Sequence, residues 1–174
     1  MSDVLRPLLA GIDALARWSG RLAVVLVGVI GVIVVWEVVA RYLFNDPTIW
    51  TEETARLAMV WAVYAAAALI LQERRLIVIN AVVRLLPEAW RRAQEVFVLV
   101  LIVAFSAVAV VWGLGIIQES IAVGRASATM LRLPQWIFEL PVPLGFALLA
   151  LQALARIVRL LLGWEAPAEG ESAL

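Results

Sequence analysis

Long stretches without charged residues are the main feature of the hydrophobic pattern along this chain. Four of them are free, or nearly free, of charge: 22–36, 57–72, 96–118 and 133–155, the last interrupted only by Glu139. A helix needs roughly 20 apolar residues to cross a bilayer, within a range of about 17–25. The two shorter stretches reach this length when extended to Tyr42 and back to Trp50, because Trp, Tyr and Arg side chains are typical of the membrane interface. The pattern therefore predicts four transmembrane helices, at about 22–42, 50–72, 94–118 and 134–158.

Composition supports a lipid environment for these helices. Of the 174 residues, 64% are hydrophobic and 16% are charged, with a mean hydropathy of +0.98, whereas soluble chains are about 45–50% apolar and about 25% charged. Buried core helices are the alternative for the shorter stretches, but little polar sequence remains to cover such a core. The sequence thus predicts an all-α integral membrane protein with a single four-helix domain over residues 1–162.

Missing residue types exclude several kinds of chemistry. The chain contains no Cys and no His, and its 14 cations, all Arg, are balanced by 14 acidic residues. Disulfides, thiolate nucleophiles, Cys/His zinc sites and His-ligated haem cannot be built from such a chain. We therefore predict no catalytic residues, no metal and no cofactor, and the balanced charge argues against a nucleic-acid partner.

The arginines predict an orientation. Ten of the 14 lie before the first span, between the second and third, or after the fourth: Arg6, Arg17, Arg21, Arg74, Arg75, Arg84, Arg91, Arg92, Arg156 and Arg159. The two other connections hold the remaining four. Because cytoplasmic loops carry an excess of Arg and Lys, both termini and residues 72–95 are predicted to be cytoplasmic.

The segments outside the spans have patterns of their own. Before the first span, one helical face carries apolar residues (Leu5, Leu8, Leu9, Ile12, Leu15 and Ala16) and the opposite face carries Asp3, Arg6, Asp13 and Arg17. This predicts a cytoplasmic helix lying in the interface, and favours its retention over cleavage as a signal peptide near Ala40. The connection at 76–92 has a weaker pattern of the same kind, and residues 163–174 are predicted to be disordered.

Two carboxylates, Glu37 and Glu139, fall inside the predicted spans and are candidates for proton or cation handling. Arg41 follows Glu37 by four residues, in the order that favours an ion pair on a helix, and Glu139 lies only a few residues into the fourth span. We therefore favour structural pairing over a transport role for both.

The connection between the first two spans is the most informative stretch. Asp46-Pro47 predicts a turn, Thr51 is placed to cap the second helix, and Glu52 and Glu53 fall in its first turn, where the helix dipole favours acids. Trp50 is predicted to anchor this start at headgroup level. The acids and Arg56 would form an exposed charged rim suited to a docking partner. Our candidates for structural or partner-contact roles are Glu37, Arg41, Trp50, Glu52, Glu53 and Arg56.

Small residues recur at four-residue spacing on two spans, at Ala58, Ala62 and Ala66 and at Ala109 and Gly113. Such faces allow close helix–helix approach in lipid, either within this chain or with another.

Two blocks of sequence resemble a known family. Arg41-Tyr42-Leu43-Phe44-Asn45 and Trp50-Thr51-Glu52-Glu53-Thr54-Ala55-Arg56 are similar to the Arg-Tyr-x-Phe-Asn and Trp-Ser/Thr-Glu-Glu-x-x-Arg runs of the small membrane subunit (DctQ type) of tripartite ATP-independent periplasmic (TRAP) transporters. The Ala-rich second span with Trp61, then Leu133-Pro134-x-Trp136 continuing to Pro141 and Gly145, extends the resemblance over roughly residues 20–162. One departure is that Leu76 and Asn80 stand where many family members have His and Asp.

The resemblance implies a small permease subunit in the bacterial inner membrane. It would scaffold a large permease subunit, which imports a solute from a periplasmic solute-binding protein at the expense of an ion gradient, with membrane lipids as the remaining partner. The alternative is a self-contained four-helix transporter of the multidrug type, but that requires a carboxylate near mid-membrane, whereas Glu37 lies towards one end of its span. A membrane-bound enzyme or electron carrier, the third class, would need ligands and acid–base residues that this sequence lacks.

Overall fold

The computed structural model describes residues 2–46, 48–73, 87–129 and 131–164, and these residues form helices joined by short connections. The helices are α1 (Ser2–Leu43), α2 (Thr51–Gln72), α4 (Glu88–Val123), α5 (Trp136–Glu139) and α6 (Pro141–Leu161). Within these residues, four helical stretches are long and apolar enough to cross a membrane: Leu5–Leu43, Thr51–Gln72, Trp90–Val123 and Trp136–Leu161. The predicted fold class, an all-α chain with four helices able to span a bilayer, is confirmed. Most of the surface element predicted at 76–92 lies outside the described residues. Almost all of the tail predicted at 163–174 also lies outside them.

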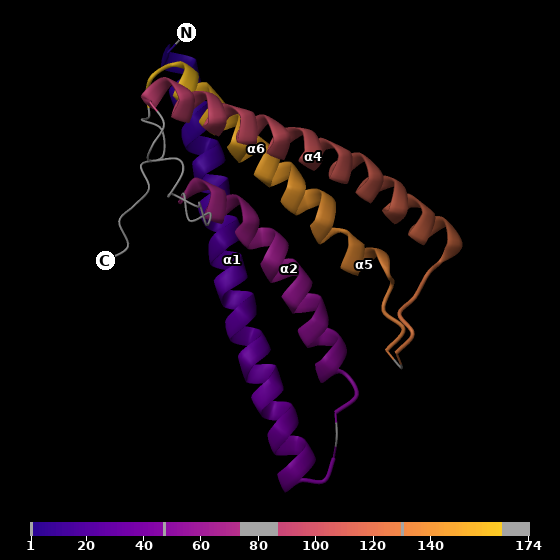
Figure 1. Ribbon diagram of the computed structural model, residues 1–174. Helices are drawn as coiled ribbons and strands as arrows, with labels where there is room; N and C mark the ends of the chain where they lie inside the picture. Colours follow the sequence, from indigo (N-terminus) through magenta and orange to yellow (C-terminus); the bar gives the residue numbers. More distant parts are fainter. Residues whose placement is uncertain (1, 47, 74–86, 130, 165–174) are drawn as a thin grey trace.

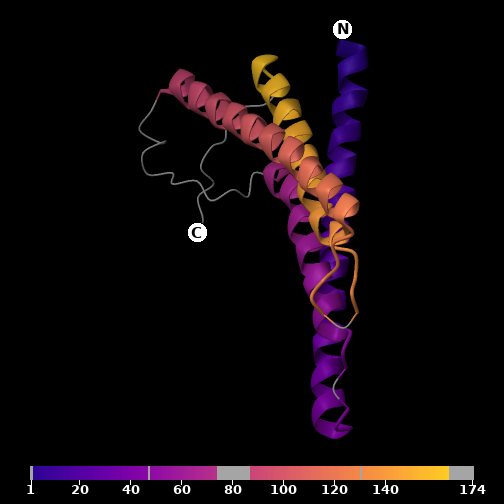
Figure 2. The same cartoon turned by 90° about the vertical axis from the view of Figure 1, so that its right-hand side faces the viewer.

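The four long helices pack side by side in the order α1, α2, α6, α4. Figure 1 shows α2 lying along α1 and α6 lying along α4, with α2 and α6 joining the two pairs. Both views place the start of α1, the start of α4 and the end of α6 at the same end of the molecule (Figures 1 and 2). We call this the terminal end, and the end with the α1–α2 connection the hairpin end.

Helix α1 is a single unbroken helix of 42 residues. At 1.5 Å per residue it is about 63 Å long, roughly twice the 30 Å hydrocarbon core of a bilayer. The amino-terminal segment that we predicted as a helix of its own is therefore continuous with the first span. Leu9 and Ala16 are buried, and Asp13, predicted to lie on the polar face, contacts α6 instead of facing water. That this half of α1 lies in the membrane interface stays a prediction.

Small side chains decide where the helices approach most closely. A Cβ placed on Gly145 of α6 would stand 2.7 Å from Tyr64 Cβ of α2, and one placed on Gly20 of α1 would collide with Leu69 of α2. Gly113 of α4 packs on Pro143 of α6. The predicted small-residue faces therefore serve contacts within this chain at Gly113, and Ala58 and Ala62 are also buried.

Aromatic and aliphatic side chains fill the space between α2, α4 and α6. Phe146 of α6 makes ring contacts with Tyr64 of α2, at 5.8 Å between centroids, and with Phe105 of α4, at 5.6 Å. Nearer the terminal end, a buried cluster takes one or more residues from each of these helices: Leu71, Leu99, Ala153 and Leu160. Helix α6 thus lies at the centre of the packing.

Candidate functional site

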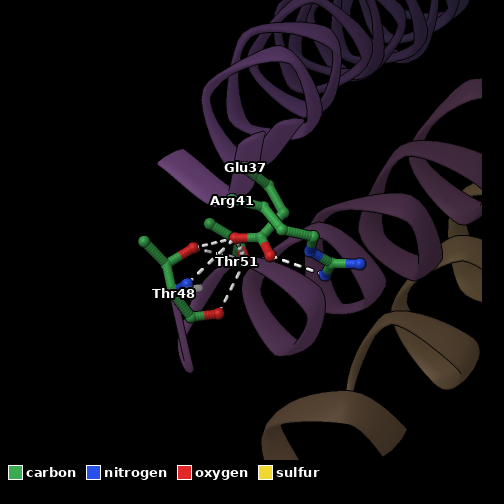
Figure 3. A network of polar contacts seen from close by, with 4 residues as sticks. All are labelled: Glu37, Arg41, Thr48 and Thr51. Atoms are coloured by element: carbon green, nitrogen blue, oxygen red, sulfur yellow. Dashed lines mark hydrogen bonds and ion pairs between the residues drawn. The ribbon is translucent and has the colours of Figure 1, made fainter. Parts of the chain in front are cut away.

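The carboxylate of Glu37 is the centre of a polar cluster at the hairpin end. Its Oε1 accepts a hydrogen bond from Arg41 Nη2 at 2.7 Å. Its Oε2 lies 2.8 Å from Thr51 Oγ1 and 3.3 Å from the Thr48 backbone nitrogen, and also accepts from the Thr48 hydroxyl. Figure 3 shows these side chains converging from α1, from the connection and from the start of α2. The predicted Glu37–Arg41 pair is present, and two threonines extend it into a network.

This network joins the end of α1 to the start of α2. Thr51 is 3% exposed, and its hydroxyl turns towards Glu37. The prediction that Thr51 caps α2 is wrong: the residue at the cap position is Trp50, which makes no side-chain cap hydrogen bond. A charged carboxylate accepts a stronger hydrogen bond than an uncharged group, which explains why the Thr51 hydroxyl goes to the neighbouring helix.

The two acids that follow Trp50 have opposite environments. Glu52 pairs with Arg56 at 3.1 Å, and both side chains are exposed, at 85% and 63%. Glu53 is 3% exposed, and its Oε2 accepts a hydrogen bond from the Thr129 hydroxyl in the connection between α4 and α5. The predicted exposed rim is therefore wrong for Glu53, because one helical position further the side chain faces the bundle.

A second contact between the two helix pairs involves a proline. Pro141 has no backbone N–H, so it cannot donate to the Ile137 carbonyl four residues earlier, as a helix would require. Trp61 Nε1 of α2 donates to that carbonyl at 3.2 Å. The proline divides the predicted fourth span into α5 and α6. Trp61, from another helix, donates to the Ile137 carbonyl that the proline leaves without a backbone donor.

The terminal end has a polar network of its own, centred on α6. Gln152, Arg156 and Arg159 are spaced four and three apart and so share one helical face. Asp13 of α1 accepts from Gln152 at 3.0 Å and from Arg159 at 2.6 Å. Arg156, 7% exposed, pairs with Glu95 of α4 and donates to the Leu71 carbonyl of α2 at 3.2 Å. Three side chains of α6 together thus contact all of the other three long helices.

The two carboxylates predicted inside the spans, Glu37 and Glu139, have different surroundings. Glu37 is held by several donors, and in the described part of the chain no three His, Cys, Asp or Glu side chains gather as metal ligands would. Glu139 ends α5, and its Oε2 is buried with no hydrogen-bond partner among the described residues, so the structural pairing predicted for Glu139 is not found at this oxygen. The arrangement is that of a packed helical bundle with polar contacts at both ends.

Comparison with protein families agrees with the two sequence blocks. Residues 30–163 match the family described as "Tripartite ATP-independent periplasmic transporters, DctQ component". The chain belongs to this family. The DctQ resemblance found in the sequence is thereby confirmed, and the family is one of transporter components. No match was found among curated proteins.

Segments that carry the DctQ resemblance lie close together in the structure. Glu53, from the Trp50–Arg56 block, contacts Thr129, four residues before the Leu133-Pro134-x-Trp136 run, and Trp61 donates to the Ile137 carbonyl of α5. The departure at 74–80 from the DctQ pattern lies outside the described residues. The sequence analysis did not single out Thr48, Thr129 or Gln152. Hydroxyl and amide side chains are common at protein surfaces, so no sequence signal distinguishes these three. They contact Glu37, Glu53 and Asp13 only because the helices pack as they do.

Proposed function

We propose that this DctQ-type chain is the small permease subunit of a TRAP transporter that supports a large permease subunit in the bacterial inner membrane. The large subunit would carry out solute import driven by an ion gradient, with solute delivered by a periplasmic binding protein. Family membership over residues 30–163 is the observation that carries this proposal. The many exposed apolar residues on α1 support it further.

Helix α1 offers the face that fits a membrane partner best. Only 6% of its most apolar window is buried inside this chain. Val24, Gly28, Gly31 and Val35 follow one another at four, three and four residues and form one exposed stripe, which we call the α1 stripe. A Cβ added at Gly28 or Gly31 would have no atom from another part of the described chain within 4 Å. Small residues at such a face let a second helix approach closely in lipid.

The test of scaffolding is co-purification with a large TRAP permease subunit co-expressed from the same genome. We expect tagged wild-type chain to recover the permease in mild detergent. Gly28→Leu and Gly31→Leu should weaken this complex by about tenfold or more, because overpacking an interface costs about 1–3 kcal/mol. Gly115→Leu on α4, where a Cβ also meets open space, is the matched control and should leave recovery unchanged.

Reconstitution tests the transport role. Uptake into proteoliposomes should require this chain, the large permease, the binding protein and an ion gradient together. Solute or drug uptake by the purified chain alone would contradict the scaffold proposal and favour the multidrug-type alternative. Equal recovery of the permease by the wild type and the Gly28 and Gly31 variants would instead locate the interface elsewhere on the chain.

A further inference from the structure

A groove opens between α1 and α2 at the hairpin end, with a volume of about 670 Å³. The part farther from the α1–α2 connection is apolar and includes Ile30, Ile33 and Val34 of α1. Its rim is polar and includes Arg41, Glu52 and Arg56. The lining of the groove therefore changes from apolar to charged along the helices towards the α1–α2 connection.

The length of the groove corresponds to one leaflet of a bilayer. From Ile30 to Arg41 the helix rises about 17 Å, at 1.5 Å per residue, and half of the hydrocarbon core is about 15 Å. A transmembrane helix of another subunit would cross the whole bilayer and need a contact surface about twice as long. An acyl chain with its headgroup has both the length and the order of polarity that the groove presents.

The rim provides groups that bind a phospholipid headgroup. Among the described residues, Arg41 and Arg56 each contact a carboxylate through Nη2, Arg41 at 2.7 Å from Glu37 and Arg56 at 3.1 Å from Glu52. A guanidinium has five N–H donors in a planar fork that suits phosphate, and both side chains are more than half exposed. Glu52, 85% exposed, provides an acceptor for a headgroup ammonium. Together with Glu37, which also lines the groove, these residues carry two positive and two negative charges, and their sum of zero matches that of a zwitterionic lipid.

We propose that this groove binds one phosphatidylethanolamine molecule of the surrounding leaflet. Arg41 and Arg56 hold its phosphate, Glu52 accepts from its ammonium, and one acyl chain lies along Ile30, Ile33 and Val34. A lipid bound here fills the space between α1 and α2 on the side of the Glu37 network that faces the terminal end. In this proposal Glu52 and Arg56 bind a lipid headgroup, whereas the sequence suggested that they bind a protein docking partner.

Native mass spectrometry of the full chain, purified in detergent and stripped of lipid, tests this proposal. Added phosphatidylethanolamine should give one retained molecule, and diacylglycerol, which lacks the phosphate and the amine, should not. Arg56→Gln should bind about tenfold more weakly, because a charge-assisted hydrogen bond is lost. Arg125→Gln removes an arginine that also pairs with a nearby carboxylate, that of Glu119, but lies outside the groove, and should bind lipid as the wild type does.

A second pair of variants tests the apolar part of the groove. Val34→Trp should fill it and abolish lipid retention, whereas Val63→Trp, at an exposed position of α2 outside the groove, should not. Equal retention in all variants, or equal binding of diacylglycerol, would overturn the proposal. Loss of the permease from Val34→Trp with lipid binding unchanged would also overturn it, because the groove would then be a protein interface. Lipid binding is measured on this chain alone, so its outcome is independent of whether the chain scaffolds a permease.

Discussion

At the scale of single residues, the environment of a carboxylate decides its role more than its place in a motif does. Glu37, Glu52 and Glu53 all belong to or adjoin the same sequence block. Glu37 joins two helices, Glu52 faces outward in a surface pair, and Glu53 is buried against Thr129. The helical periodicity of 100° per residue makes neighbouring acids face different surroundings.

Glu37→Gln and Glu52→Gln compare two acids that each pair with an arginine four residues later. We expect Glu37→Gln to lower the melting temperature of the detergent-solubilised chain clearly, because it weakens the hydrogen bonds from Arg41, Thr48 and Thr51 together. Glu52→Gln should change the free energy of unfolding by no more than about 1 kcal/mol, since exposed ion pairs contribute about 0–1 kcal/mol. Equal melting temperatures of the two variants would contradict a joining role for Glu37.

Trp61→Phe should destabilise the chain by about 1–3 kcal/mol, because the Ile137 carbonyl loses its donor while most of the ring packing is kept. Trp112→Phe is the matched control, since Trp112 is 71% exposed. Pro141→Ala restores a backbone N–H that can donate to Ile137, so the Trp61→Phe/Pro141→Ala double variant should lose less than the sum of the single variants. Strict additivity in thermal unfolding would exclude this coupling.

At the scale of elements, α6 organises the bundle because it contacts each of the other long helices. At one end its Gly145 admits Tyr64 of α2, and at the other its arginines bind acids from α1 and α4. Helices in lipid have no hydrophobic driving force to associate, so close packing and hydrogen bonds between them provide the attraction. The polar face of α6 and its small residues supply both.

Gly145→Ala and Gly115→Ala should have opposite effects on stability. Alanine is favoured over glycine in a helix interior by about 1 kcal/mol, and a Cβ at Gly115 meets open space. At Gly145 the added Cβ would stand 2.8 Å from the Tyr64 backbone oxygen, so α2 and α6 must separate. Thermal unfolding in detergent should rank Gly115→Ala at or above the wild type and Gly145→Ala below it. A Gly145→Ala variant as stable as the wild type would show that the α2–α6 contact tolerates separation.

At the scale of the whole molecule, α1 and α4 lie on the outside of the row and are longer than a bilayer is thick. Helix α4 has 36 residues, or about 54 Å, and Figure 1 shows it running obliquely to α1. A helix longer than the hydrocarbon core tilts or projects. Arg6 lies over the ring of Trp164 at 5.3 Å, and Arg21 lies over the ring of Trp18, further along α1, at 5.2 Å. Tryptophan with arginine is a combination typical of a membrane interface.

The orientation can be tested on this cysteine-free chain. Asp46→Cys and Ala128→Cys should react with a membrane-impermeant thiol reagent in intact spheroplasts, because the hairpin end is predicted to be periplasmic. Glu88→Cys should react only after the membrane is opened, since the ten-to-four distribution of arginines predicts a cytoplasmic position for it. Labelling of Glu88→Cys in intact spheroplasts would contradict the predicted orientation and indicate the opposite one.

The sequence by itself determined that the chain is helical, that four of its helical stretches can span a membrane, and which family it belongs to. Length, uninterrupted hydrophobicity and two local motifs carry that information, and none of them depends on which helices touch. The sequence also indicated the Glu37–Arg41 pair, because residues four apart on one helix are neighbours in any fold.

Only the tertiary structure decided which residues face one another across helices. The joining of Thr51 to Glu37, of Glu53 to Thr129 and of Trp61 to the carbonyl freed by Pro141 depends on the rotation and depth of each helix relative to its neighbour. The surroundings of the first half of α1 were decided in the same way, because the Leu9 carbonyl and the Asp13 carboxylate both accept hydrogen bonds from Arg159 of α6 and give this half of the helix a partner within the chain. Hydrophobicity determines that a helix lies in lipid. Its rotation about its own axis is determined by close packing and by hydrogen bonds to neighbouring helices, and these contacts exist only once the helices lie side by side.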